Sequence, residues 1–283
     1  MTEQHTSQND ASRPAPIDQV QERKRRTYSL PKATRPSPST NPELFDGYAD
    51  DLNRTALGQQ MLVDATRALA ASNSQMNDVA DAEDAIIKSE NERVAAGGDP
   101  GNIRMINGKA TPTPTQYDEL AQAAEPALDK AIVQIEERIQ KHYRLQISIL
   151  NKMSDALVDP VTARDHTLMG QIRDHMTKLG KVKAMHFATK AAMDGDLPAI
   201  HTILSSPHYL SSLDAKDIGK VREAANKALS PDLNRAYEVG LKIEKSMALA
   251  KKGLVEKRDT INKYRVHSQK NAADALSKLK KLK

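Results

Sequence analysis

The residues of this chain with the clearest chemical use are the lysines and arginines near its C-terminal end. Thirteen of the 42 residues from Lys242 to Lys283 are Lys or Arg, and four are acidic. Such cations bind phosphate oxygens and release counterions from nucleic acid without reading its sequence. We predict contacts with nucleic-acid phosphates or with an acidic protein surface, and the alternative is the solvated outer face of a coiled coil. The residues expected to make these contacts are Lys251, Lys252, Lys257, Arg258, Lys278, Lys280, Lys281 and Lys283.

A second basic run lies near the N-terminus, among six prolines that precede residue 43. It consists of Arg23, Lys24, Arg25 and Arg26. We expect it to contact phosphate or an acidic subunit, and a solvated charge run or a nuclear import signal are the alternatives. The surrounding Pro, Ser, Thr and Gln residues bury too little apolar surface to form a packed element, so residues 1–42 are predicted to be an extended or disordered arm that orders against a partner.

Residue patterns that would support catalysis or metal binding are missing from the sequence. The eight histidines form no His-Glu-x-x-His motif,. Residues 101–109 do not make a phosphate-binding loop, because Ile103 stands where that motif needs glycine,. The run 194–196 (Asp-Gly-Asp) lacks the other oxygen ligands of a calcium loop and is predicted to be a helix-ending turn. We therefore expect no enzyme, cofactor or metal; the alternative, a site built from distant His and Asp side chains, requires a concave polar pocket within residues 162–229.

Composition favours an all-α fold. The chain of 283 residues has two Phe, seven Tyr and no Trp, and 28% of its residues are charged. Aromatic residues favour strands, whereas the abundant Ala, Leu, Lys, Gln and Glu favour helices. The lack of Cys excludes disulfides and thiolate metal sites,. No run of eighteen apolar residues occurs and the first eighteen residues are polar, so we expect neither a membrane span nor a secretory signal.

Five segments are predicted along the chain. After the arm come an Ala-rich helical segment (43–96), a linker (97–116), a helical bundle (117–230) and a long basic C-terminal helix (231–283). Within the linker, Ile103 to Ile106 followed by Asn-Gly predicts a small hairpin. Net charge is +2 over residues 1–45, −9 over 46–129 and +12 over 130–283. An acidic middle between basic ends indicates separate surfaces for separate partners, or contacts between these parts.

The bundle opens with a coiled-coil-like seam, in which apolar residues recur at steps of three and four. We predict that this seam joins copies of the chain into a homo-oligomer. His142 and Gln146 occupy two seam positions; they either fix the register by hydrogen bonding or lie where the helix leaves its partner, and we favour the second interpretation. The apolar seam residues are Leu128, Ile132, Ile135, Ile139, Ile149 and Met153.

Capping residues and prolines predict the helices that follow. One helix is expected from about Thr162 to Met193, and a shorter one over 198–204. Asp214 and Asp217 predict the start of a helix that runs to Leu229, with Leu210 and Leu213 packed inside the bundle. Ser230 and Pro231 then predict an N-cap and the first residue of the last helix.

The stretch from Leu197 through Leu254 contains the sequences LSSPHYLSSL (204–213), DAKD (214–217) and LSPDL (229–233). With these it resembles part of the little-characterised helical virion and assembly proteins of tailed bacteriophages. The resemblance implies an internal head, core, ejection or scaffold-type protein that contacts coat or portal subunits and packaged DNA. We therefore expect a non-enzymatic virion structural or assembly protein, made in the host cytoplasm and located in the virion. The alternative is a cytoplasmic nucleic-acid-binding regulator.

Overall fold

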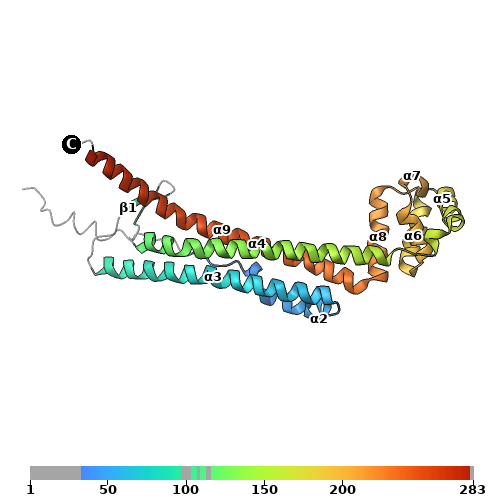
Figure 1. Ribbon diagram of the computed structural model, residues 1–283, viewed down its shortest axis with the longest axis horizontal. Coiled ribbons are helices and arrows are strands. Elements are labelled where there is room, and N and C mark those ends of the chain that lie inside the picture. The colour runs from blue at the N-terminus through green and yellow to red at the C-terminus, as the bar shows by residue number, and fades with distance from the viewer. Residues whose placement is uncertain (1–32, 97–102, 107–108, 113–115, 281–283) are drawn as a thin grey trace, which may run out of the picture. The chain divides into compact units, whose positions relative to one another are not determined.

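The computed structural model describes residues 33–96, 103–106, 109–112 and 116–280, which are almost entirely helical (Figure 1). The predicted all-α class is therefore confirmed. The helices in chain order are η1 (Pro38–Thr40), η2 (Pro42–Tyr48), α2 (Ala49–Leu52), α3 (Ala56–Ala95), α4 (Gln116–Ala156), η3 (Thr162–Arg164), α5 (His166–Asp194), α6 (Leu197–Ser205), α7 (His208–Ser211), α8 (Ala215–Leu229) and α9 (Pro231–Lys280).

Contacts between residues divide the chain into two units. The larger unit comprises residues 35–78 and 124–259, and the described residues of the smaller one are 33–34, 79–96, 103–106, 109–112, 116–123 and 260–280.

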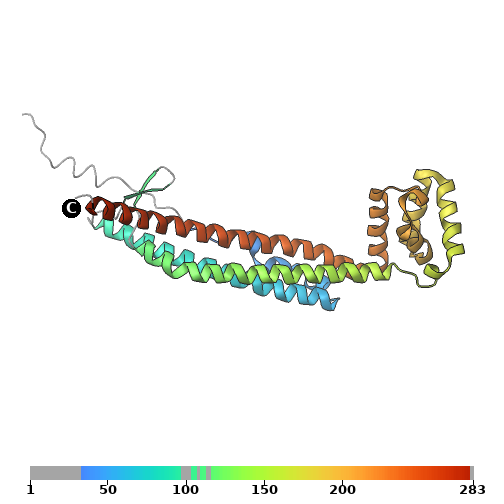
Figure 2. The ribbon, with the colours of Figure 1, turned by 45° about the horizontal axis from the view of Figure 1, so that its top comes forward.

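In the larger unit, α3, α4 and α9 pack side by side around an aliphatic core (Figures 1 and 2). Helices α4 and α9 run antiparallel, since Glu136 pairs with Lys251 while the earlier Asp129 pairs with the later Arg258. Burying each large apolar side chain stabilises the fold by about 1.5–3 kcal/mol. The buried core residues of this bundle include Met61, Leu69, Met76, Leu128, Ile135, Ile149, Met153, Ile243, Met247 and Leu254.

The seam predicted for α4 lies inside this bundle. Five of its six apolar residues are buried within one chain, and Ile139 is half-buried. The expectation that the seam joins copies of the chain is therefore wrong. A heptad pattern shows that one face of a helix is covered, but the covering helices can belong to the same chain, as α3 and α9 do here.

The predicted Ala-rich helix of residues 43–96 is interrupted near its start. Helices η2 and α2 precede α3, and the chain turns between α2 and α3. The Thr55 hydroxyl accepts a hydrogen bond from the backbone N–H of Gly58 at 3.0 Å and so satisfies one free donor at the start of α3,. Gly58 is required there, because a Cβ would lie 2.4 Å from the backbone oxygen of Leu52.

Helices α5 to α8, called the α5–α8 cluster below, have an apolar core of their own. Gly195 ends α5 with a φ of 71°, which confirms the predicted helix-ending turn,. Asp214 caps α8 by accepting the N–H of Asp217 at 2.9 Å, as predicted. The helix expected over 162–193 is broken, since Gly180 has a φ of 69° inside α5,. The core residues are Leu157, Met176, Ala184, Ala188, Ala192, Ile200, Ile203, Leu213, Ile218, Val221 and Ala225.

The smaller unit contains the hairpin that the linker sequence predicts. Strand β1 (Ile103–Ile106) pairs antiparallel with β2 (Lys109–Pro112), with Ile103 opposite Pro112 and Ile106 opposite Lys109. The Asn-Gly turn at 107–108 lies outside the described residues. In the same unit, Val79, Ala80, Ala121 and Ile261 are buried.

The last helix begins at Pro231, as predicted, and its first turn is closed by the N–H of Asn234, which donates to the Ser230 carbonyl at 2.9 Å. Helix α9 contains 50 residues, so it is about 75 Å long at 1.5 Å per residue. Among the described residues, no helix combines the length and apolar content needed to cross a membrane.

Candidate functional site

Three of the basic residues predicted to contact a partner form ion pairs within the chain. Lys251 Nζ lies 2.8 Å from Glu136 Oε1, and Lys252 Nζ lies 3.7 Å from Glu256 Oε1. Arg258 Nη1 lies 3.1 Å from Asp129 Oδ1, and the Asp129 and Asp259 carboxylates raise the pKa of Arg258. Lys251 and Arg258 thus join α9 to α4, whereas Lys252 pairs with a neighbour on α9 itself and stays largely exposed.

The fourth predicted contact, Lys257, is only 2% exposed. It cannot reach a phosphate or a partner surface, so its assignment as a contact residue is wrong. Lys278 and Lys280 lie in α9, but their side chains are outside the described part of the chain. Arg23, Lys24, Arg25, Arg26, Lys281 and Lys283 also lie outside the described residues.

His142 and Gln146 are buried where α4 meets α9, which corrects the expectation that they lie at the edge of the packing. His142 Nε2 lies 2.8 Å from the Gly240 carbonyl oxygen, so this nitrogen carries a proton and donates it,. Because this ring nitrogen donates to Gly240, it does not accept a hydrogen bond from the Gln146 side-chain amide nitrogen, which lies 3.3 Å away,. Together with Met61, these residues form what we call the His142 junction.

Gly240 allows the helices to approach closely at this junction. A Cβ at this position would lie 2.4 Å from Met61 Cε and 3.2 Å from Gln146 Nε2, so one residue contacts both α3 and α4. Burial lowers the pKa of His142, against smaller opposing effects from the Gly240 hydrogen bond and from the Glu244 and Asp64 carboxylates. The junction therefore favours a neutral imidazole.

A second apolar stripe of α4 remains open to solvent. Tyr143, Ile147 and Leu150 are 54%, 39% and 41% exposed and recur at the i, i+4 and i+7 spacing of one helix face,. We call them the outer stripe. They follow Glu136 by seven, eleven and fourteen residues, so they continue the edge of α4 where Glu136 pairs with Lys251 of α9,. More than a third of each side chain stays open, so the outer stripe is available for contact with a protein partner.

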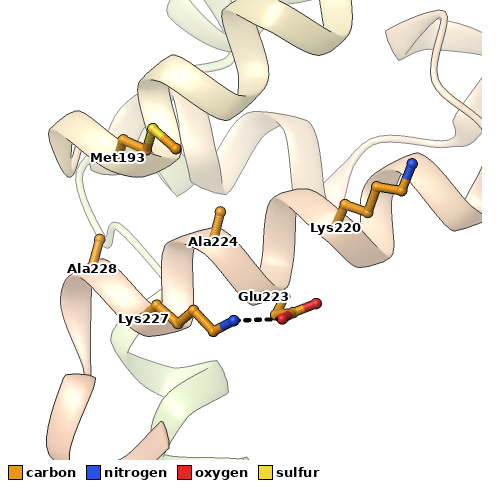
Figure 3. A pocket seen from close by; sticks show the side chains of 6 residues that line it. All are labelled: Met193, Lys220, Glu223, Ala224, Lys227 and Ala228. Carbon is orange, nitrogen blue, oxygen red and sulfur yellow. Dashed lines mark hydrogen bonds and ion pairs between the residues drawn. The ribbon is translucent and has the colours of Figure 1, made fainter.

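The α5–α8 cluster has a shallow hollow at the ends of α5 and α8 (Figure 3). Lys227 Nζ pairs with Glu223 Oε1 at 2.6 Å across its rim. None of its lining residues is His or Asp, so the hollow does not match the polar pocket that a site built from distant His and Asp side chains requires. The lining residues are Met193, Lys220, Glu223, Ala224, Lys227 and Ala228.

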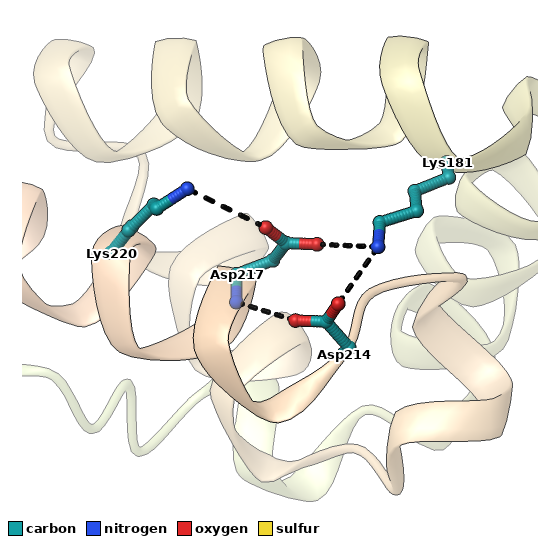
Figure 4. A network of polar contacts seen from close by, with 4 residues as sticks. All are labelled: Lys181, Asp214, Asp217 and Lys220. Carbon is teal, nitrogen blue, oxygen red and sulfur yellow. Dashed lines mark hydrogen bonds and ion pairs between the residues drawn. The ribbon is translucent and has the colours of Figure 1, made fainter.

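A network of four charged residues ties α5 to the start of α8 (Figure 4). Lys181 Nζ lies 2.7 Å from Asp214 Oδ2 and 3.3 Å from Asp217 Oδ2, and Lys220 Nζ lies 3.8 Å from Asp217 Oδ1. The hydrogen bond from Lys181 lowers the pKa of Asp214 to about 2, and the Asp217 backbone N–H acts in the same direction. These groups cap α8 and hold it on α5, which is a structural role.

Neither the arrangement of possible metal ligands nor comparison with known proteins assigns a function to this chain. Within the described residues, no group of three or more His, Asp and Glu side chains is arranged to hold a metal ion. No family model matches this sequence, and no curated protein or solved structure shows significant similarity to it. The resemblance of residues 197–254 to phage proteins thus stays a prediction.

Sequence reasoning missed the outer stripe, although a signal for it was present. Tyr143, Ile147 and Leu150 have the residue types of the core and a regular helical spacing. Each follows a seam position by one residue, so the outer stripe flanks the heptad seam and widens the apolar surface of the helix to an adjacent side,. A helix that is apolar on two faces needs two sets of neighbours.

Proposed function

We propose that this chain is a non-enzymatic structural or assembly protein of a tailed-phage virion, of the internal head, core, ejection or scaffold type, and that it acts as an oligomer. The observation that carries the proposal is the outer stripe, because an apolar helix face outside the folded core suits protein docking. The resemblance of residues 197–254 to helical phage proteins supports the virion as the place of action.

The proposed partners are coat or portal subunits. Within the described part of α9, Lys251, Lys252 and Arg258 are paired with carboxylates of the same chain. Their use on phosphates would require breaking these pairs, which reduces the counterion release that drives DNA binding. Protein docking is therefore favoured over the alternative of a cytoplasmic nucleic-acid-binding regulator.

Mass spectrometry of purified phage particles tests this proposal. We expect the chain in fixed stoichiometry with coat and portal proteins, in assembly intermediates, in mature particles or in both. A soluble phage enzyme from the same infection is the control for carried-over cytoplasm. Recovery of the chain at no more than the level of that enzyme, in both kinds of particle, would contradict the proposal.

A further inference from the structure

The Nδ1 atom of His142 has no hydrogen bond within the described part of the chain. His142 Nε2 donates to Gly240, so in the neutral ring the other nitrogen, Nδ1, carries only a lone pair,. Nδ1 is buried and has no hydrogen-bond partner among the described residues. Protonation would place an N–H group and a positive charge there with no acceptor to satisfy them. Burying such a group costs free energy that folding must offset.

The charges around the junction do not remove this cost. From α3, the Asp64 carboxylate approaches, but it is paired with Arg138 at 3.1 Å and Lys141 at 2.6 Å, both on α4. From α9, Glu244 approaches and is half-buried. Both carboxylates favour the protonated ring, yet the burial of His142 outweighs them. A proton on His142 therefore works against the packed state of the junction.

We propose that the His142 junction is an acid-sensitive latch, which holds α4 against α9 while the imidazole is neutral and opens when the imidazole takes up a proton. Opening breaks the bond from His142 to the Gly240 carbonyl and lets water reach the protonated ring. Gly240 of α9 lies close to side chains of both α3 and α4. Loss of its hydrogen bond to His142 therefore loosens the packing of α3, α4 and α9 around the His142 junction. The inference does not depend on the proposed virion role.

The direction of the pH effect follows from proton linkage. The pKa of His142 is 6.5 in the unfolded chain and lower in the folded one. Above that pH both states carry a neutral ring, and the stabilisation is fully present. As the pH falls below it, the unfolded state binds the proton first, so the unfolding equilibrium constant rises by up to about tenfold per pH unit until the lower folded pKa is reached.

Denaturant unfolding at about pH 7.5 and about pH 5 tests the latch. The test variant is His142→Gln, which keeps an N–H donor for Gly240 but does not titrate. The control is His186→Gln, which removes an exposed histidine on α5. Between the two pH values, the unfolding constant of the natural chain and of the control should rise more than that of His142→Gln, by at most about tenfold for each pH unit below the ordinary histidine pKa. Equal pH dependence in all three proteins would overturn the proposal.

A direct titration covers the case in which His142→Gln does not fold. Nuclear magnetic resonance of the imidazole Cε1–H group follows the protonation of His142 in the natural chain. We expect its midpoint below 6.5, together with changes in the amide signals of Gly240 and its neighbours. A midpoint at or above the ordinary histidine value, or protonation that leaves the Gly240 amide unchanged, would overturn the latch.

Discussion

Replacing Ile135 with aspartate should unfold the three-helix part of the larger unit, whereas replacing Val133 with aspartate should leave it folded. Ile135 is 2% exposed, and Val133, two residues earlier on α4, is 54% exposed. At position 135 the change loses about 1.5–3 kcal/mol of apolar burial and also forces a carboxylate into the core. The total, roughly 4–6 kcal/mol, approaches the whole stability of many domains.

Circular dichroism during urea unfolding measures both variants. The free energy of unfolding of Val133→Asp should stay within about 0.5 kcal/mol of the natural chain, as for most surface substitutions. Equal free energies of unfolding for the two variants would contradict the burial of Ile135 within one chain.

Removing the outer stripe should weaken docking at least tenfold without unfolding the chain. The triple variant Tyr143→Gln, Ile147→Gln and Leu150→Gln replaces three partly exposed apolar side chains by a good helix former,. Covering the exposed part of each side chain in a complex contributes on the order of 1 kcal/mol. Since about 1.4 kcal/mol corresponds to a tenfold change in affinity, incorporation into particles should fall at least tenfold.

A matched control separates this effect from a general loss of surface hydrophobicity. Val161→Gln combined with Val182→Gln removes two of the most exposed apolar side chains, which lie before and within the α5–α8 cluster. This control should incorporate like the natural chain when both are quantified in purified particles. Normal incorporation of the triple variant, or an equal loss of incorporation for the control, would show that the outer stripe is not the docking face.

The helix boundaries were largely predictable because local residues set them. Ser230 and Pro231, the Asp214 cap and the turn at Gly195 each place a helix end through a bond or a dihedral angle within a few residues,. The positive φ of Gly180 inside α5 was not predictable in this way. A lone glycine is tolerated inside a helix, and only its neighbours in space decide whether it takes a positive φ.

What covers each helix face was not predictable from its pattern. The spacing from Leu128 to Met153 predicted a buried face, but α3 and α9 cover it from about 70 and 100 residues away,. His142 was misplaced for the same reason, because its partner, the Gly240 carbonyl, is a backbone group with no sequence signature.

The candidate site was less predictable than the fold because charge counts say nothing about pairing. Lys251 and Arg258 were counted as free cations, yet they meet Glu136 and Asp129, which lie more than 100 positions away. Lys257 occupies a core position of α9, three residues after the buried Leu254. Its residue type suggested a surface contact, while its place in the helical repeat put it inside.

Intramolecular cross-linking tests most directly the central claim that α4 and α9 of one chain pack together and leave the outer stripe for a partner. The chain has no cysteine, so Glu136→Cys with Lys251→Cys introduces only the pair in question; the side chains replaced are 2.8 Å apart. Treatment of the dilute protein with a short bismaleimide should give a cross-linked monomer, and neither single variant should. Cross-linked dimers as the main product would contradict the account, because the seam would then join two chains.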